Sequence, residues 1–99
     1  MHTIDYNNLD ELRIGFINYL KTYHPNIGRP EVRAGNALFI GRHNIGISLE
    51  ETLTTPNGIQ RAKIMLEDFW IAGGTRKNPK KNALVYAHDL KLLKEYIES

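Results

Sequence analysis

The sequence predicts an all-α protein with four long helices and one short helix in an orthogonal bundle. Apolar residues recur at spacings of three and four in several segments, as they do on the buried face of a helix. Helix-capping patterns and proline or glycine breaks separate these segments. No pair of segments shows the alternation typical of paired strands. We expect residues 1–99 to form a single helical domain, because so short a chain supports one core.

The first helix is predicted to begin after Asn8 and to end near Tyr23. Asn8 is followed three residues later by Glu11, the spacing of a capping box. A turn with Pro25 and Gly28 follows the helix. Its apolar stripe comprises Leu9, Leu12, Phe16, Leu20 and Tyr23, and Ile17 and Tyr19 widen it.

The second segment allows two interpretations. Pro30 and Glu31 suit the start of a helix, and we predict a helix over about residues 30–43. Its predicted face carries Val32, Asn36, Phe39 and His43, with Leu38 and Ile40 beside it. Three glycines between residues 35 and 46 each weaken a helix by about 1 kcal/mol relative to alanine. A short buried strand over residues 37–40 is the competing interpretation.

A short helix and a long helix are predicted next. Ser48 and Glu51 form a second capping-box pattern, so the short helix should end near Leu53. The long helix should begin after Thr55 or Asn57 and close at Gly73 in a left-handed conformation. It is apolar around much of its circumference, so we expect it to be central. Its predicted buried stripe comprises Ile59, Ala62, Leu66, Phe69 and Trp70.

The last predicted helix begins at Asn78 and Pro79, since asparagine caps free N–H groups and proline has none to leave unpaired. Its apolar stripe comprises Ala83, Tyr86, Ala87, Leu90, Leu93 and Ile97. We expect Ala83, Leu90 and Leu93 in particular to be buried.

Lys80 and Lys81 lie in the first turn of this helix, where the helix dipole disfavours a cation by about 0.3–1 kcal/mol. Arg76 and Lys77 come just before them. Four cations beside the free N–H groups of a helix start favour binding of a phosphate. The alternative interpretation is a solvated loop with a charged surface.

The charge distribution adds to this hypothesis. The formal net charge of +2 does not by itself indicate nucleic-acid binding. Residues 56–99, however, carry eight Lys or Arg against five Asp or Glu, whereas residues 1–55 carry five against six. This asymmetry predicts one basic face.

The chain contains little to support catalysis. It has no cysteine, which excludes disulfides and thiolate chemistry. No two histidines have the i, i+4 spacing of a helical metal site; the four are His2, His24, His43 and His88. We therefore expect no enzymatic activity, no metal and no cofactor. With neither a signal-peptide pattern nor an apolar run of about 18 residues, we expect a cytoplasmic protein without a membrane segment.

We predict that cationic and short polar side chains form a nucleic-acid-binding surface. Its members are Arg29, Arg33, Arg61, Lys63, Thr75, Arg76, Lys77, Asn78, Lys80, Lys81 and Asn82. For Arg61 and Lys63, pairing with Glu67 is the alternative.

The order of segments resembles a known family. The segment Phe16-Ile17-Asn18-Tyr19-Leu20, a helix from Pro30, the segment 48–53 and a final helix over residues 82–97 resemble the core-binding domain of phage-type integrases, the tyrosine recombinases. The resemblance implies a SAM-like bundle that grips duplex DNA from one side, with residues 76–82 facing the DNA. The integrase catalytic domain has no counterpart here, so the resemblance implies no strand cleavage.

A protein-interaction module is the alternative function, for instance a phage or mobile-element protein that binds and inhibits a nucleic-acid enzyme. Low net charge and apolar residues outside the clearest stripes favour it. These residues are Tyr6, Ile40, Ile45, Ile47, Met65 and Ile71.

Overall fold

The computed structural model describes residues 4–99, and these residues form five helices and no strand. The helices are α1 (Leu9–Tyr23), α2 (Pro30–Arg42), α3 (Leu49–Thr54), α4 (Gly58–Gly73) and α5 (Pro79–Glu98). The predicted all-α class, with four long helices and one short one, is confirmed, and residues 37–40 are helical. His2 lies outside the described residues.

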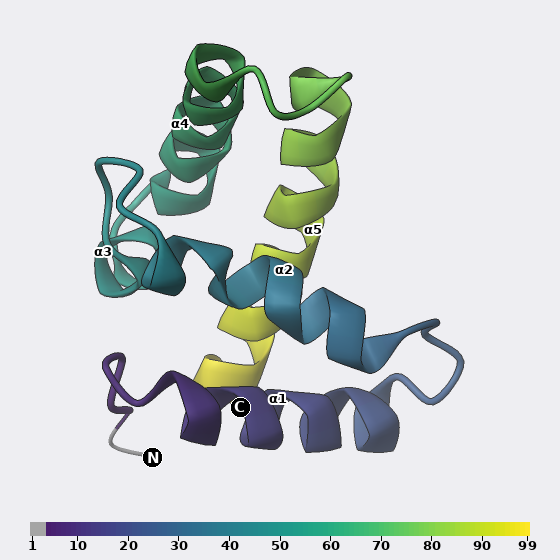
Figure 1. Ribbon diagram of the computed structural model, residues 1–99. Helices are drawn as coiled ribbons and strands as arrows, with labels where there is room; N and C mark the ends of the chain where they lie inside the picture. Colours follow the sequence, from purple (N-terminus) through teal and green to yellow (C-terminus); the bar gives the residue numbers. More distant parts are fainter. Residues whose placement is uncertain (1–3) are drawn as a thin grey trace.

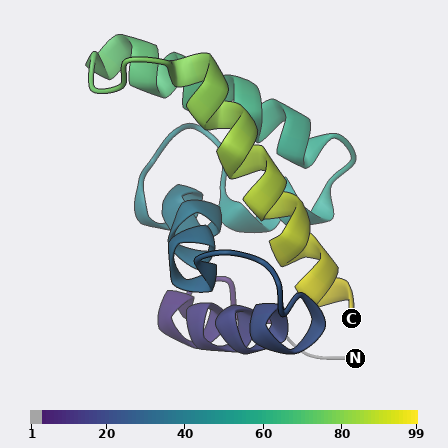
Figure 2. The same cartoon turned by 90° about the vertical axis from the view of Figure 1, so that its right-hand side faces the viewer.

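Helix α5 connects the two parts of the molecule (Figure 1). Its N-terminal half lies antiparallel to α4, and the two helices form a hairpin that projects from the body. Helix α2 crosses the middle of α5, and α1 packs beneath α2 near the end of α5. A second view shows α5 running across the full height of the molecule (Figure 2). These steep crossings make the bundle orthogonal.

The prediction that α4 would be central is wrong, because α5 occupies that place. Helix α4 packs mainly on α5 and on the short α3, and Phe69 and Trp70 also contact Phe39 of α2. The rest of its outer side is open. Ile64 and Ile71 are therefore exposed, and so in part is Phe69, which the stripe predicted to be buried. Apolar residues on much of a helix's circumference did not indicate burial here.

Three helix starts follow the predicted capping chemistry. The side-chain oxygens of Asn8, Ser48 and Asn78 each accept a hydrogen bond from the backbone N–H three residues later, at 3.2, 3.0 and 3.2 Å. Helix α4 differs, since Asn57 is left-handed (φ 59°) and its side chain makes no capping bond. The left-handed residue that closes α4 is Gly74 (φ 64°) rather than Gly73.

The face that α2 buries differs from the predicted one. Ala34, Ala37, Leu38 and Ile40 are buried, whereas Val32 is exposed. Helix α2 lies between α1 and α5, so it packs on two sides and two small alanines let the neighbouring helices approach. On α5, Ala83, Leu90 and Leu93 are completely buried, as predicted.

The crossing of α2 and α5 is held by a buried carboxylate. Asp89 on α5 is completely buried, and its Oδ1 accepts a hydrogen bond from Nη1 of Arg33 at 3.0 Å. Its Oδ2 accepts from Nδ2 of Asn36, also at 3.0 Å, and Nε of Arg33 donates to the carbonyl of Gly28 at 2.9 Å. No buried side-chain nitrogen or oxygen among the described residues lacks a partner. The charge of Asp89 is thus compensated by one cation and one amide.

We predict that Asp89→Ala destabilises the fold by about 3 kcal/mol, because it leaves Arg33 and Asn36 without their partner at a covered crossing. The control is Glu31→Gln, which removes the exposed Lys21–Glu31 ion pair and should cost much less, because solvent screens an exposed pair. Urea unfolding midpoints measure both. Equal losses would show that the Asp89 network is no more important than a surface pair.

A second prediction compares two helical glycines. A Cβ at Gly58 would overlap the carbonyl oxygens of Glu51 and Thr52, whereas one at Gly35 would meet nothing within 4 Å. Gly58→Ala should therefore separate α3 from α4 and destabilise by about 1–3 kcal/mol. Gly35→Ala should stabilise by roughly 0.5–1 kcal/mol, since alanine favours the helix. Thermal unfolding of the two variants should shift in opposite directions, and a shift in the same direction would contradict this assignment.

Candidate nucleic-acid interface

The α4–α5 connection and the first turn of α5 lie at the end of the projecting hairpin (Figure 1). We call residues 74–82 the hairpin tip. Lys77, Lys80 and Lys81 are exposed there, and none forms an ion pair within residues 4–99. No Asp or Glu occurs in residues 69–88, and the first turn of α5 has no acidic residue. The tip is therefore positive and without local compensation.

Arg76 has a different role from the three lysines. Its guanidinium carbon lies 4.6 Å from the ring centroid of Trp70 and 5.6 Å from that of Tyr86. Its Nη2 also donates a hydrogen bond to the Tyr86 hydroxyl at 3.2 Å. Arg76 is partly covered as a result and ties the tip to α4 and α5 through cation–π contacts.

Two of the three uncharged polar side chains of the tip support the start of α5, and the third is exposed. The side chain of Asn78 caps α5, and Nδ2 of Asn82 donates to the Asn78 carbonyl at 2.8 Å. Both asparagines thus serve the helix start. Thr75 is exposed, and its hydroxyl bonds to no other described residue.

The other arginines predicted for the interface are placed elsewhere. Arg33 is bound to Asp89 at the helix crossing. Arg61 donates to Glu51 at 3.0 Å and to Thr55 Oγ1 at 2.8 Å, so its partner is Glu51 and not Glu67. Arg29 lies in the α1–α2 turn with a left-handed backbone (φ 55°), away from the tip in both views (Figures 1 and 2). These three arginines do not join the tip in one patch.

Lys63, the remaining predicted residue, belongs to a second basic site. A groove of about 320 Å³ lies between the start of α4 and the middle of α5. We call it the basic groove. Its charged and ionisable lining residues are Lys63, Lys91, Lys94 and His88, and none of its lining residues is acidic.

Sequence reasoning missed Lys91, Lys94 and His88. A usable signal was present, because Lys80, Leu84 and Lys91 are separated by four and seven residues and so share one face of α5. The groove lining includes both Leu84 and Lys91, which confirms this face. The basic groove thus lies along α5 on the side that carries Lys80.

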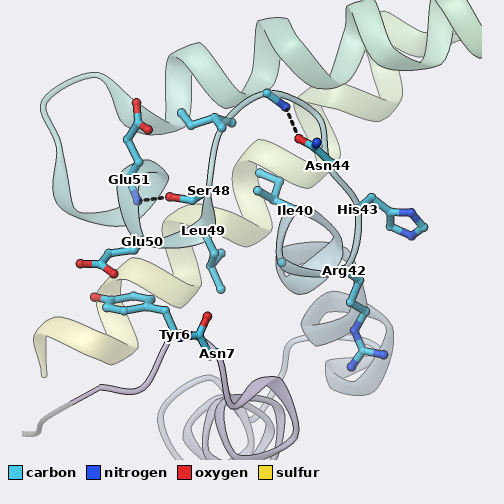
Figure 3. A pocket seen from close by; sticks show the side chains of 13 residues that line it. Tyr6, Asn7, Ile40, Arg42, His43, Asn44, Ser48, Leu49, Glu50 and Glu51 are labelled. Carbon is cyan, nitrogen blue, oxygen red and sulfur yellow. Dashed lines mark hydrogen bonds between the residues drawn. The ribbon is translucent and has the colours of Figure 1, made fainter.

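A second pocket, of about 520 Å³, lies where the end of α2 and the start of α3 meet the N-terminal segment (Figure 3). Burial and the nearby charge of Glu50 raise the pKa of Tyr6. Figure 3 shows Arg42 and His43 pointing away from Glu50 and Glu51. The basic and acidic side chains of this pocket thus lie on different sides of it.

A polar cluster joins α1 to the end of α5. Oε2 of Glu95 accepts a hydrogen bond from the Tyr19 hydroxyl at 2.7 Å and lies 2.6 Å from Nε2 of His24. The hydrogen bond to Glu95 is the main cause that raises the pKa of Tyr19 to about 12. The hydrogen bonds from Tyr19 and then His24 lower the pKa of Glu95. Sequence alone gave His24 no partner, since Glu95 is 71 residues away.

The described residues offer no other site with recognisable chemistry. Residues 4–99 contain no group of three His, Asp or Glu side chains placed to hold a metal ion. Among the helices of this part of the chain, none has both the length and the apolar character needed to cross a bilayer. Comparisons with protein-family models, with curated proteins and with solved structures found no match.

The Glu95 cluster predicts a specific pH dependence. The folded-state pKa of Glu95 is lower than the ordinary value of 4.5, so its stabilising effect is present above that pH and is lost as the pH falls through the folded-state pKa. Glu95→Gln should therefore flatten the decline of the unfolding midpoint below about pH 4.5. Glu98→Gln removes an exposed carboxylate on the same helix and is the control. If both variants retain the same acid profile as the unmodified protein, Glu95 does not couple folding to pH.

Proposed function

We propose that the protein binds duplex DNA through the hairpin tip and has no catalytic activity of its own. The observation that carries this proposal is the set of exposed, unpaired cations Lys77, Lys80 and Lys81 within a 20-residue segment that contains no acidic residue. Lysines on a projecting element neutralise DNA phosphates and release the counterions around them.

The start of α5 adds a directional contribution. Within residues 4–99, the Lys80 N–H bonds to no acceptor, and the helix dipole places partial positive charge at this end. Lys80 and Lys81 add cations where the dipole already disfavours them. A bound phosphate would interact favourably both with the two lysines and with the positive end of the helix dipole.

The resemblance to integrase core-binding domains supports the same proposal. In that family the last long helix lies near the major groove and the phosphates. The corresponding helix here is α5, whose N-terminal half forms the projecting hairpin with α4.

A protein partner is the second candidate. Among residues 4–99, five of the eight exposed large hydrophobic residues lie on the hairpin, and they are Ile64, Phe69, Ile71, Leu84 and Val85. Of the apolar residues that suggested this function, Ile71 is exposed, but Ile40 and Ile47 are buried. Recovery of one stoichiometric protein partner that resists nuclease treatment would favour this candidate over DNA.

The proposal predicts that Lys80→Gln with Lys81→Gln weakens duplex binding at low salt by about tenfold or more. It should also lower the slope of log K against log salt by roughly 0.9 for each lysine that contacts a phosphate. Removing cations from the first turn should leave the fold unchanged or stabilise it by about 0.3–1 kcal/mol per residue. A short duplex titrated by fluorescence anisotropy at several salt concentrations measures the binding.

The matched control is Arg13→Gln with Lys21→Gln, which removes the same charge from α1 at the opposite end of the molecule (Figure 1). This control should change the salt slope little. If the unmodified protein shows no binding at low salt, or if both double variants behave alike, DNA binding through the tip is excluded.

A further inference from the structure

We infer that the basic groove is a phosphate-binding site, with Lys63, Lys91 and Lys94 as its cationic ligands. The phosphate belongs to a DNA strand that continues from the hairpin tip along α5; this assignment of the source rests on the proposed function. The site itself rests on the groove.

Three lysines line the groove from two helices. Lys63 projects from the second turn of α4, and Lys91 and Lys94 project from the middle of α5. Lys63 and Lys94 are only partly exposed, so the groove walls restrict them. An anion in the groove gains favourable electrostatic interactions with all three lysines.

Carboxylates near the groove do not neutralise these lysines. Glu67 follows Lys63 by four residues but forms no ion pair within residues 4–99, and Glu95 is bound to Tyr19 and His24. Glu98 lines a separate cavity that touches the other side of Lys94. The groove lining therefore remains wholly basic or neutral.

Backbone donors lie in the same groove. Asn57, Ile59 and Gln60 belong to its lining, and the Asn57 side chain leaves α4 without a cap. The N–H groups of Ile59 and Gln60 bond to no acceptor within the described chain. They supplement the lysines as donors to an anion oxygen.

The size and wall chemistry of the groove define what enters it. A volume of about 320 Å³ is at the lower end of small-molecule sites. Leu84 and Ile59 form the apolar part of the groove wall, and His88 lines the groove from α5. A phosphate with its attached sugar fits this volume and lining.

The groove is in register with the tip along α5. Lys80 and Lys91 are eleven residues apart, which is three helical turns to within about 20° and roughly 16 Å along the axis. One strand lying along α5 can thus place a phosphate at each site.

The experiment observes the site directly by NMR, using the whole chain. Sodium pyrophosphate should shift the His88 ring signals and the backbone amide signals of Ile59 and Gln60. Lys63→Gln with Lys91→Gln should weaken pyrophosphate binding at least about tenfold, the change expected from loss of one or more charge-assisted contacts. The control Arg13→Gln with Lys21→Gln, on α1, should leave the shifts of these groove signals unchanged. Unaltered thermal unfolding of the groove variant shows that the fold is intact.

A second arm identifies the source of the phosphate. A short duplex should shift the same signals, and the groove variant should lower its salt slope by about 0.9 for each lysine that contacts a phosphate. Pyrophosphate shifts with an unchanged duplex slope would overturn the assignment to a DNA strand and assign the groove to a small phosphorylated molecule. Absence of these shifts with both probes overturns the site. Because the tip variant tests duplex binding separately, failure of the proposed function is distinguishable from failure of the groove.

Discussion

The buried carboxylate of Asp89 sets the arrangement on which the rest of the molecule depends. A carboxylate without solvent is tolerated only where cations and hydrogen-bond donors replace its water, and Arg33 and Asn36 supply these from one face of α2. Their bonds fix the position of α2 along α5. Because the same α5 continues into the hairpin with α4, they also fix the direction in which the hairpin tip projects.

Local chemistry made the helix starts predictable from the sequence, whereas packing partners were not. Asn8, Ser48 and Asn78 each accept a hydrogen bond from the N–H three residues later, so a few neighbouring residues are enough to predict the cap. The exposed Val32 and the outward side of α4 depend on which helices lie alongside, and periodicity within one helix carries no such information. Asp89 did leave a signal, since it falls between Tyr86 and Leu93 on the apolar stripe of α5.

The same distinction applies to the basic residues. The hairpin tip could be predicted because its cations are adjacent in sequence and no acid lies nearby. The basic groove could not, because packing of α4 on α5 joins Lys63 to Lys91, 28 residues later. Arg33 and Arg61 carry the same charge as the tip lysines, yet their acidic partners are 56 and 10 residues away. Charge alone therefore did not separate structural arginines from candidate ligands.

The lysines of the tip and the groove differ from several other cations in what lies beside them. Lys21 of α1 pairs with Glu31 of α2, and Arg61 of α4 pairs with Glu51 of α3. At the tip and in the groove, Lys80 and Lys91 form no ion pair within residues 4–99. The first turn of α5 has no acidic residue, although one would favour the helix. Helix α5 does not need that contribution, since complete burial of Leu90 and Leu93 supplies its stability through packing. The packed middle of α5 therefore leaves its N-terminal end and its outer face able to carry charges that are suited to a ligand rather than to folding.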